Sequence, residues 1–196
     1  MLHADSHQSL QDVAATAPPA PPSGGYPPIL QDGVIFTGFF AADQAKFPYQ
    51  PTFGSNNVLI EVPPTAQPQP PKIVIGDRDV NNIHVKAFEL KGFDSKCGEF
   101  GTQQPLRCEL TVTCKTAAGA TATKSGFIFK ETQKERNVVT PFADFGDDKR
   151  FGAVVECTFS VKSLDQPTRE LLLLIDDFDY QVWRVPKGEK DCRVPS

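Results

Sequence analysis

The sequence predicts an all-β domain folded as a two-sheet antiparallel β-sandwich. Several segments alternate apolar and polar residues with a period of two, which is typical of strands that bury one face. No convincing apolar stripe follows the 3.6-residue helical period. The 196 residues also include 18 prolines and 14 glycines, a composition that favours short strands joined by turns.

Turn signals such as Ala118-Gly119 and Gly146-Asp147-Asp148 separate the expected strands. The segment 164–174 is the one helix candidate, but Pro167 and the following leucine run favour a buried central strand. We expect strands over Val34–Phe40, Asn57–Glu61, Lys72–Ile75, Ile83–Leu90, Cys108–Lys115, Ser125–Lys130, Phe151–Val161 and Glu170–Val182.

The chain divides into a leader, one domain and a tail. Residues 1–28 are rich in proline and alanine and lack the branched apolar residues that offset ordering entropy, so they predict a disordered tether. Residues 29–186 carry the strand patterns and form the expected sandwich, and residues 187–196 form a C-terminal tail. A second proline cluster at 63–71 is expected to be a loop inside the domain, because proline donates no ladder hydrogen bond.

Charge and hydropathy exclude two classes of partner. The formal net charge of -4 and the pI near 5.4 give no overall attraction to nucleic acid or to an anionic membrane surface. The one basic cluster, Lys130 to Arg136, is diluted by two glutamates. No apolar run is long enough to cross a bilayer. We therefore expect a monomer with no nucleic-acid or membrane partner.

The five cysteines are not arranged in the paired clusters of a zinc site. In the segment Cys108–Cys114, both cysteines share the apolar strand face, whereas Glu109, Thr111 and Thr113 share the polar face. Cys157 lies on the apolar face of a second alternating segment, 155–161. Inward-facing cysteines on separate strands can form a disulfide.

We propose disulfides Cys97–Cys108, across a local loop, and Cys114–Cys157, between strands, with Cys192 left in the tail. Such bridges are typical of secreted proteins. No signal peptide is visible at Met1–Asp5, so the expectation of an extracellular location rests on the cysteines. The alternative is that all five are free, buried thiols of a cytosolic protein, and mass measurement with and without reductant distinguishes the two.

Several segments together resemble a group of small secreted proteins of filamentous fungi. The resemblance covers about residues 30 to 183, and each motif in it is short. It is carried by Gly33–Phe40, Gly54–Leu59, Phe88–Cys97, Pro105–Cys114, Phe127–Phe129, Phe145–Phe159 and Leu174–Tyr180.

The resemblance implies a jelly-roll sandwich, similar to galactose-binding-like domains and carbohydrate-binding modules. It also implies that Cys97 and Cys108 pair, whereas Cys114 and Cys157 stand where that group is not expected to have cysteines. The resemblance implies no established activity, because a fold does not determine function.

Candidates for catalysis are few. His84 is the one histidine outside the leader, and no nucleophile motif lies near it, so we read it as a surface residue. Asp176 and Asp177 are adjacent in an expected strand and point to opposite faces, so they cannot flank one glycosidic bond. We therefore expect no enzyme activity and assign no catalytic residue.

Asp176 is a candidate ligand for a structural calcium ion. The period-two pattern places Asp176 on the core face with Phe178, where a charge requires a partner or a metal. The alternative is a carboxylate bonded to backbone amides or turned to solvent at a bulge. The acidic loop 144–148 is a second calcium candidate, with a solvated turn as its alternative reading. No cofactor is otherwise expected.

Sugar binding usually requires exposed aromatic rings beside polar groups. Trp183 falls on the strand face opposite to Val182, and Phe39, Tyr49 and Phe53 fall at loop or strand-edge positions. We take these four aromatic residues as ligand-binding candidates, with core packing as the alternative for each.

Two hypotheses for function remain. The first is a secreted, non-catalytic domain that binds carbohydrate or cell-wall polysaccharide. The second is a secreted effector-like module that binds a host or cell-wall protein and has no affinity for sugars. A polysaccharide pull-down separates them.

Overall fold

The structure is a computed structural model, and it describes residues 28–43, 57–61, 71–76, 83–99, 106–129, 142–165 and 171–186. None of these residues lies in an α-helix, so the prediction of an all-β chain is confirmed for them. The same part of the chain has no helix long and apolar enough to span a bilayer. The predicted leader, apart from Pro28, and the predicted tail with Cys192 lie outside the described residues.

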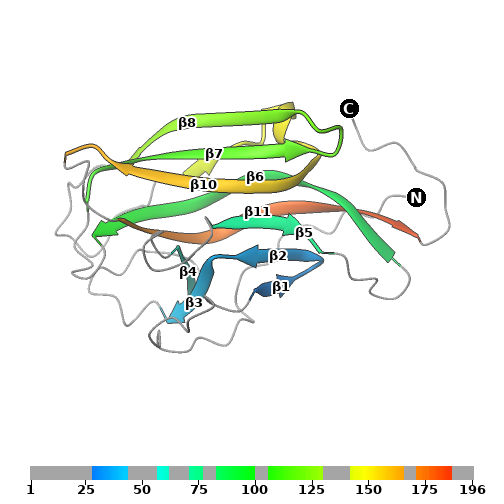
Figure 1. Cartoon of the computed structure of the whole chain (residues 1–196), viewed down its shortest axis with the longest axis horizontal. Coiled ribbons are helices and arrows are strands. Elements are labelled where there is room, and N and C mark those ends of the chain that lie inside the picture. Colours follow the sequence, from blue (N-terminus) through cyan, green and yellow to red (C-terminus); the bar gives the residue numbers. More distant parts are fainter. Residues whose placement is uncertain are drawn as a thin grey trace.

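The strands form one continuous antiparallel sheet that curls around its own core (Figure 1). A short 3-10 helix precedes β10. The elements are β1 (Ile29–Gln31), β2 (Val34–Thr37), β3 (Phe39–Asp43), β4 (Asn57–Glu61), β5 (Lys72–Ile75), β6 (Ile83–Glu99), β7 (Cys108–Thr116), β8 (Thr121–Phe129), β9 (Phe142–Asp144), η3 (Lys149–Phe151), β10 (Val154–Ser163) and β11 (Leu171–Pro186).

The sheet branches at β10. Cys157 and Thr158 pair with both β7 and β5, so these two strands lie on opposite edges of β10. One series of paired strands runs β8-β7-β10-β5-β2-β1, and a second runs β9-β6-β11-β4-β3. The two series are joined where Val154 of β10 pairs with Phe88 of β6. The strand pairing describes one continuous sheet. The expected division into the two separate sheets of a jelly-roll sandwich goes beyond this pairing.

Aromatic rings fill the space inside the curl. Phe36 of β2 contacts Phe178 of β11 at 5.6 Å between ring centroids, although these strands are not paired. Phe93 of β6 lies 5.3 Å from Phe178 and 5.7 Å from Phe159 of β10. These contacts join strands from both series, and aromatic pairs at such distances add to the stabilisation from burial.

Both predicted disulfides are present. Cys97 and Cys108 connect the end of β6 to the start of β7, with their Cα atoms 6.3 Å apart. Cys114 and Cys157 are direct register partners on β7 and β10, with Cα atoms 4.0 Å apart. Disulfides suggest an oxidising environment of the extracellular type.

Six of the eight predicted strands have different bounds in the structure, including the following three. The strand expected over Val34–Phe40 is divided at Gly38, whose φ of +78° interrupts the extended backbone. The strand expected from Ile83 to Leu90 continues to Glu99, because β11 pairs with it along that length. Phe151, expected to begin a strand, instead ends η3.

Candidate functional site

The outer face of β7, β8 and β10 carries a regular set of hydroxyl side chains. Val112 of β7, Ala122 of β8 and Phe159 of β10 are buried, so the residues that alternate with them in each strand face outward. The outward residues are exposed or half-exposed. We call the following residues the hydroxyl array: Thr111 and Thr113 of β7, Thr123 and Ser125 of β8, and Thr158 and Ser160 of β10.

Strand register aligns the hydroxyl array into rows that run across the strands. Register partners in a sheet lie side by side, with neighbouring strands about 4.8 Å apart, and alternate residues of one strand lie about 6.8 Å apart. The β7–β8 register shifts only beyond Thr111, so the array lies within a regular stretch. The rows are Thr123–Thr113–Thr158 and Ser125–Thr111–Ser160.

The hydroxyl array itself is uncharged, and pairs of opposite charge border it. On one side Lys162 Nζ lies 2.6 Å from Glu109 Oε2. On the other side Lys72 Nζ lies 3.5 Å from Glu156 Oε2, and Lys115 is the register partner of Glu156. These border residues are three lysines and two glutamates, so their charges sum to a single positive charge.

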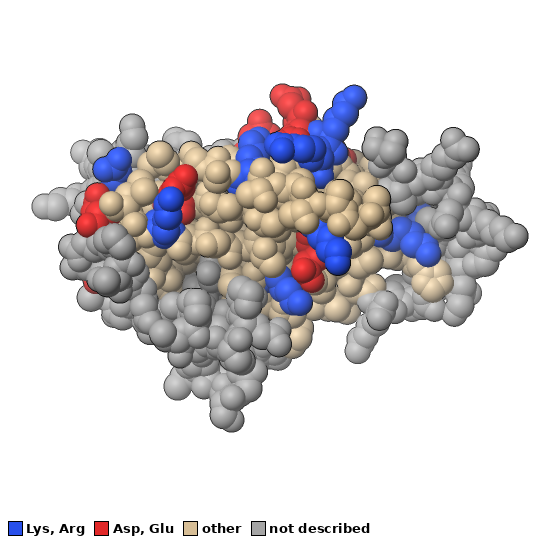
Figure 2. Space-filling model, turned by 45° about the horizontal axis from the view of Figure 1, so that its top comes forward, with Lys and Arg blue, Asp and Glu red and all other residues tan. Residues whose placement is uncertain are grey.

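Figure 2 brings forward the side of the molecule that carries β7, β8 and β10 at the top of Figure 1. Charged side chains on this view stand in small groups, and uncharged surface separates the groups.

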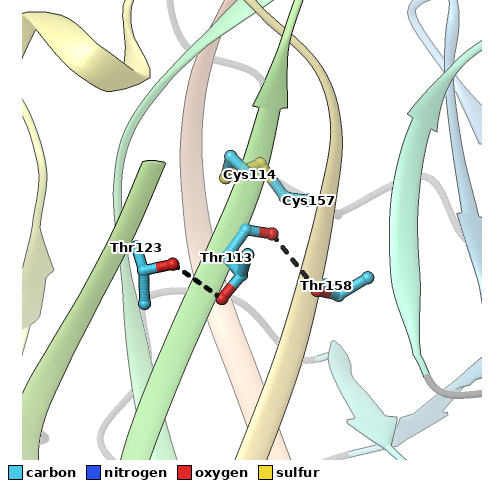
Figure 3. The surroundings of a disulfide bond; sticks show 5 residues. All are labelled: Thr113, Cys114, Thr123, Cys157 and Thr158. Atoms are coloured by element: carbon cyan, nitrogen blue, oxygen red, sulfur yellow. Dashed lines mark hydrogen bonds between the residues drawn. A yellow bond between two sulfur atoms is a disulfide. The ribbon is translucent and has the colours of Figure 1, made fainter. Parts of the chain in front are cut away.

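Hydrogen bonds and a disulfide hold the first row in place (Figure 3). Thr113 Oγ1 and Thr123 Oγ1 share a hydrogen bond of 3.2 Å, and Thr158 Oγ1 donates to the Thr113 carbonyl at 3.2 Å. The disulfide Cys114–Cys157 joins the same two strands one residue away. Threonine is β-branched and stiff at χ1, so the hydroxyls of this row have restricted positions.

Trp183 lies on the outer face of β11 and is half-buried, whereas its neighbour Val182 is in the core. The indole Nε1 donates to the Gly152 carbonyl at 2.9 Å, which fixes the ring beside η3. Its register partner is Ala87 of β6. The side chain is on the face that the sequence predicted, and its contact with a ligand stays a prediction.

The prediction that Phe39 contacts ligand is wrong. Phe39 is 0% exposed, and its ring packs against Phe36 at 6.4 Å and Phe159 at 5.7 Å. The backbone interruption at Gly38 starts a new strand at Phe39, and this strand directs the ring into the core. Tyr49 and Phe53 lie outside the described residues.

Asp176 is fully buried, as predicted, and it has an interaction partner. Ile175 and Phe178 both belong to the core, because register shifts between Asp176 and Asp179 break the alternation that the sequence suggested. Across the described ranges, no group of three or more His, Cys, Asp or Glu side chains is placed to hold a metal ion. A calcium ion at Asp176 therefore stays a prediction.

The acidic loop 144–148 uses carboxylates in local contacts. Asp144 Oδ1 accepts a hydrogen bond from the Gly146 amide at 2.9 Å. Asp148 caps η3 and accepts from Arg150 Nε at 2.9 Å and Nη2 at 2.6 Å. These hydrogen bonds hold the pKa of Asp148 below its usual range. The arrangement fits the alternative reading of a turn at the surface.

Sequence reasoning placed Thr111 and Thr113 on a polar strand face and assigned them no role. The signal that identifies the hydroxyl array is the repetition of a hydroxyl residue at alternate positions in Thr111–Thr113, Thr123–Ser125 and Thr158–Ser160. Only the register between these strands shows that the repeats lie side by side.

No protein-family model matches the chain, and no curated protein matches it with significance.

Proposed function

We propose that this protein is a secreted, non-catalytic domain that binds carbohydrate, with cell-wall polysaccharide as its ligand. The observation that carries the proposal is the hydroxyl array. A threonine or serine hydroxyl both donates and accepts hydrogen bonds, as a sugar hydroxyl does, so aligned hydroxyls suit a polyhydroxylated ligand. The half-buried indole of Trp183 adds a second surface on which a sugar ring can pack.

Other parts of the proposal follow from the resemblance to secreted fungal proteins. We propose that the two series of strands are the two sheets of a jelly-roll sandwich, with the aromatic core between them. A structural calcium ion at Asp176 belongs to the same proposal. It predicts a rise in melting temperature on addition of calcium that the variant Asp176→Asn loses.

A pull-down with insoluble chitin, glucan, mannan, xylan and pectin tests the proposed function. The array variant Thr113→Val/Thr123→Val removes both partners of one hydroxyl hydrogen bond and keeps the β-branched shape. Thr37→Val is the matched control, because Thr37 faces outward on β2 and also has one hydroxyl bond, to the Lys72 carbonyl. Trp183→Ala reports on the other surface.

We expect the wild-type protein and Thr37→Val to be retained by at least one neutral polymer and the array variant to be retained less. Retention of no polymer would contradict the proposed function. If Trp183→Ala alone lost retention, carbohydrate binding would remain the function of the protein, and the binding site would be the indole of Trp183 and not the hydroxyl array.

A second candidate function, binding to a protein, is favoured by the open edge of β8. In the described residues β8 pairs with β7 alone. The short Cα separation of Cys114 and Cys157 is that of a non-hydrogen-bonded pair, and hydrogen-bonding direction alternates along a strand. The backbone groups of Thr121 and Thr123 therefore point away from β7. A partner could add a strand to this edge.

Thr121→Pro tests the second candidate. Proline removes the outward amide of Thr121 at the first residue of β8, where a proline is tolerated. The protein-binding function predicts a partner that the wild-type protein retains and Thr121→Pro does not. It also predicts that the array variant retains this partner, whereas a partner retained equally by all variants would contradict pairing at this edge.

A further inference from the structure

We propose that the hydroxyl array recognises the ordered surface of an uncharged polysaccharide, in preference to a soluble or disordered chain of the same polymer. The inference rests on the proposed function and names the ligand class of its site. It follows from the arrangement of the hydroxyls, from their lack of charge and from the rigidity of the strands that carry them.

The array repeats in two directions, across the strands and along them. Thr37 of β2 lies outside the array, because the charged Lys72 of β5 separates it from Thr158. A surface with two repeats fits a ligand that also repeats in two directions.

Each hydroxyl contact is weak, because a sugar exchanges a bond to water for a bond to the protein. Useful affinity then requires several contacts made together. A flexible chain loses conformational freedom for each unit that it aligns, and this loss opposes binding. In a packed polysaccharide surface the sugar hydroxyls already have fixed spacing, so the ligand loses much less freedom.

Charge favours a neutral ligand. The array itself carries no charge, and the pairs Lys162–Glu109 and Lys72–Glu156 at its borders leave Lys115 in excess. An anionic polymer such as pectin gains attraction from a single excess lysine and also meets the carboxylates of Glu109 and Glu156. The binding of a neutral polymer depends little on ionic strength, because no charge pair with the ligand is screened.

The disulfide Cys114–Cys157 contributes to this recognition by holding β7 and β10 in register beneath the array (Figure 3). Thr113 and Thr158 are the residues next to these cysteines, and they lie opposite one another in the first row. Replacing both cysteines is therefore expected to weaken binding without removing any hydroxyl.

Binding isotherms on chitin and cellulose test the inference, with each polymer used both in its crystalline form and in its swollen, amorphous form. We expect wild-type protein to bind a crystalline form about tenfold more tightly than the matching amorphous form, at low and high salt alike. Thr113→Val/Thr123→Val is expected to lose this preference, and Thr37→Val is expected to keep it. Ser125→Ala/Ser160→Ala, in the second row, provides an independent variant.

Three results would overturn the inference. Equal binding to both forms with unchanged affinity in the array variants would leave polysaccharide binding intact and exclude the ordered-surface preference. Absence of binding to every form would remove the proposed function as well. Sedimentation equilibrium tests whether a second copy of the chain occupies this face. Self-association of the wild-type protein that the array variants lose would assign the face to that second copy.

Discussion

Gly33 lies where two constraints act on one residue. It follows Asp32 in the turn between β1 and β2, and its φ of +83° is a left-handed conformation that disfavours side chains. A Cβ atom at Gly33 would stand 2.4 Å from Val85 Cγ2 of β6. The turn therefore approaches β6 so closely that no side chain fits between them.

Gly33→Ala is expected to destabilise the fold by about 2–4 kcal/mol, the sum of a left-handed penalty of about 1 kcal/mol and overpacking of about 1–3 kcal/mol. Gly119→Ala is the matched control, because Gly119 has φ of +85° and no atom within 4 Å of the added Cβ. Urea unfolding measures both. Equal losses in the two variants would contradict the close contact with Val85.

Tyr180 predicts a loss of stability at alkaline pH. Burial, with a smaller contribution from Asp32, raises the pKa of the Tyr180 phenol above its ordinary value of 10.0. The folded state thus keeps the proton in a range where the unfolded state releases it. The resulting stability is complete below about pH 10 and decreases at higher pH, by up to about 1.4 kcal/mol per pH unit.

Tyr180→Phe is expected to lose this dependence. Near pH 8 the variant should differ from the wild type by less than about 1 kcal/mol, because the hydroxyl contact with the Gln31 carbonyl is long, at 3.4 Å. Urea unfolding from pH 8 to pH 11, with free thiols alkylated, provides the comparison. Parallel stability curves for the two proteins would show that the Tyr180 phenol does not titrate as described.

Single residues also show where sequence reasoning failed. Phe39 and Trp183 look alike in the sequence, as aromatic residues near a strand boundary. A glycine with positive φ places Phe39 in the core, while Trp183 follows the simple alternation of β11. The left-handed backbone at Gly38 and the register shifts after Asp176 both interrupt the strand alternation. A search for period-two patterns in the sequence does not detect such interruptions.

At the scale of elements, the two disulfides contribute unequally to the free energy of unfolding. Cys97–Cys108 closes a loop with a sequence separation of 11, and Cys114–Cys157 closes one of 43. In the loop-closure model they contribute about 3 and about 4 kcal/mol respectively, because the longer loop restricts the unfolded chain more.

Replacing both cysteines of a bridge with alanine tests this order. Cys114→Ala/Cys157→Ala is expected to lose about 1 kcal/mol more than Cys97→Ala/Cys108→Ala, as measured by chemical denaturation without reductant. All four cysteine side chains are buried, so the cost of the cavity is similar in both variants. An equal loss of unfolding free energy in the two variants, or a larger loss in Cys97→Ala/Cys108→Ala, would contradict the stronger constraint assigned to the β7–β10 bridge.

Strand prediction succeeded where one face is uniformly apolar. The cysteine-bearing strand β7 alternates without a break, and its expected bounds differ from the observed ones by one residue. β6 was expected to end at Leu90, but pairing with β11 extends it through Ser95, a polar residue at a buried position. β1 and β9 have three residues each, too few to show a period.

At the scale of the whole molecule, local pattern predicted the all-β class, and long-range pairing determined the rest. The disulfide Cys114–Cys157 could be proposed from two inward-facing cysteines. The hydroxyl array could not, because it requires β7 to lie between β8 and β10, which come later in the chain. Function in this account therefore depends on neighbours that are distant in sequence.

The central claim is that the hydroxyl array contacts polysaccharide, and threonine methyl NMR tests it most directly. In a threonine-labelled protein, addition of crystalline chitin or cellulose particles is expected to broaden the methyl signals of Thr111, Thr113, Thr123 and Thr158. The signal of Thr116, at the far end of β7, is expected to stay sharp. Unchanged array methyls with a perturbed Trp183 indole, or no change at all, would contradict the claim.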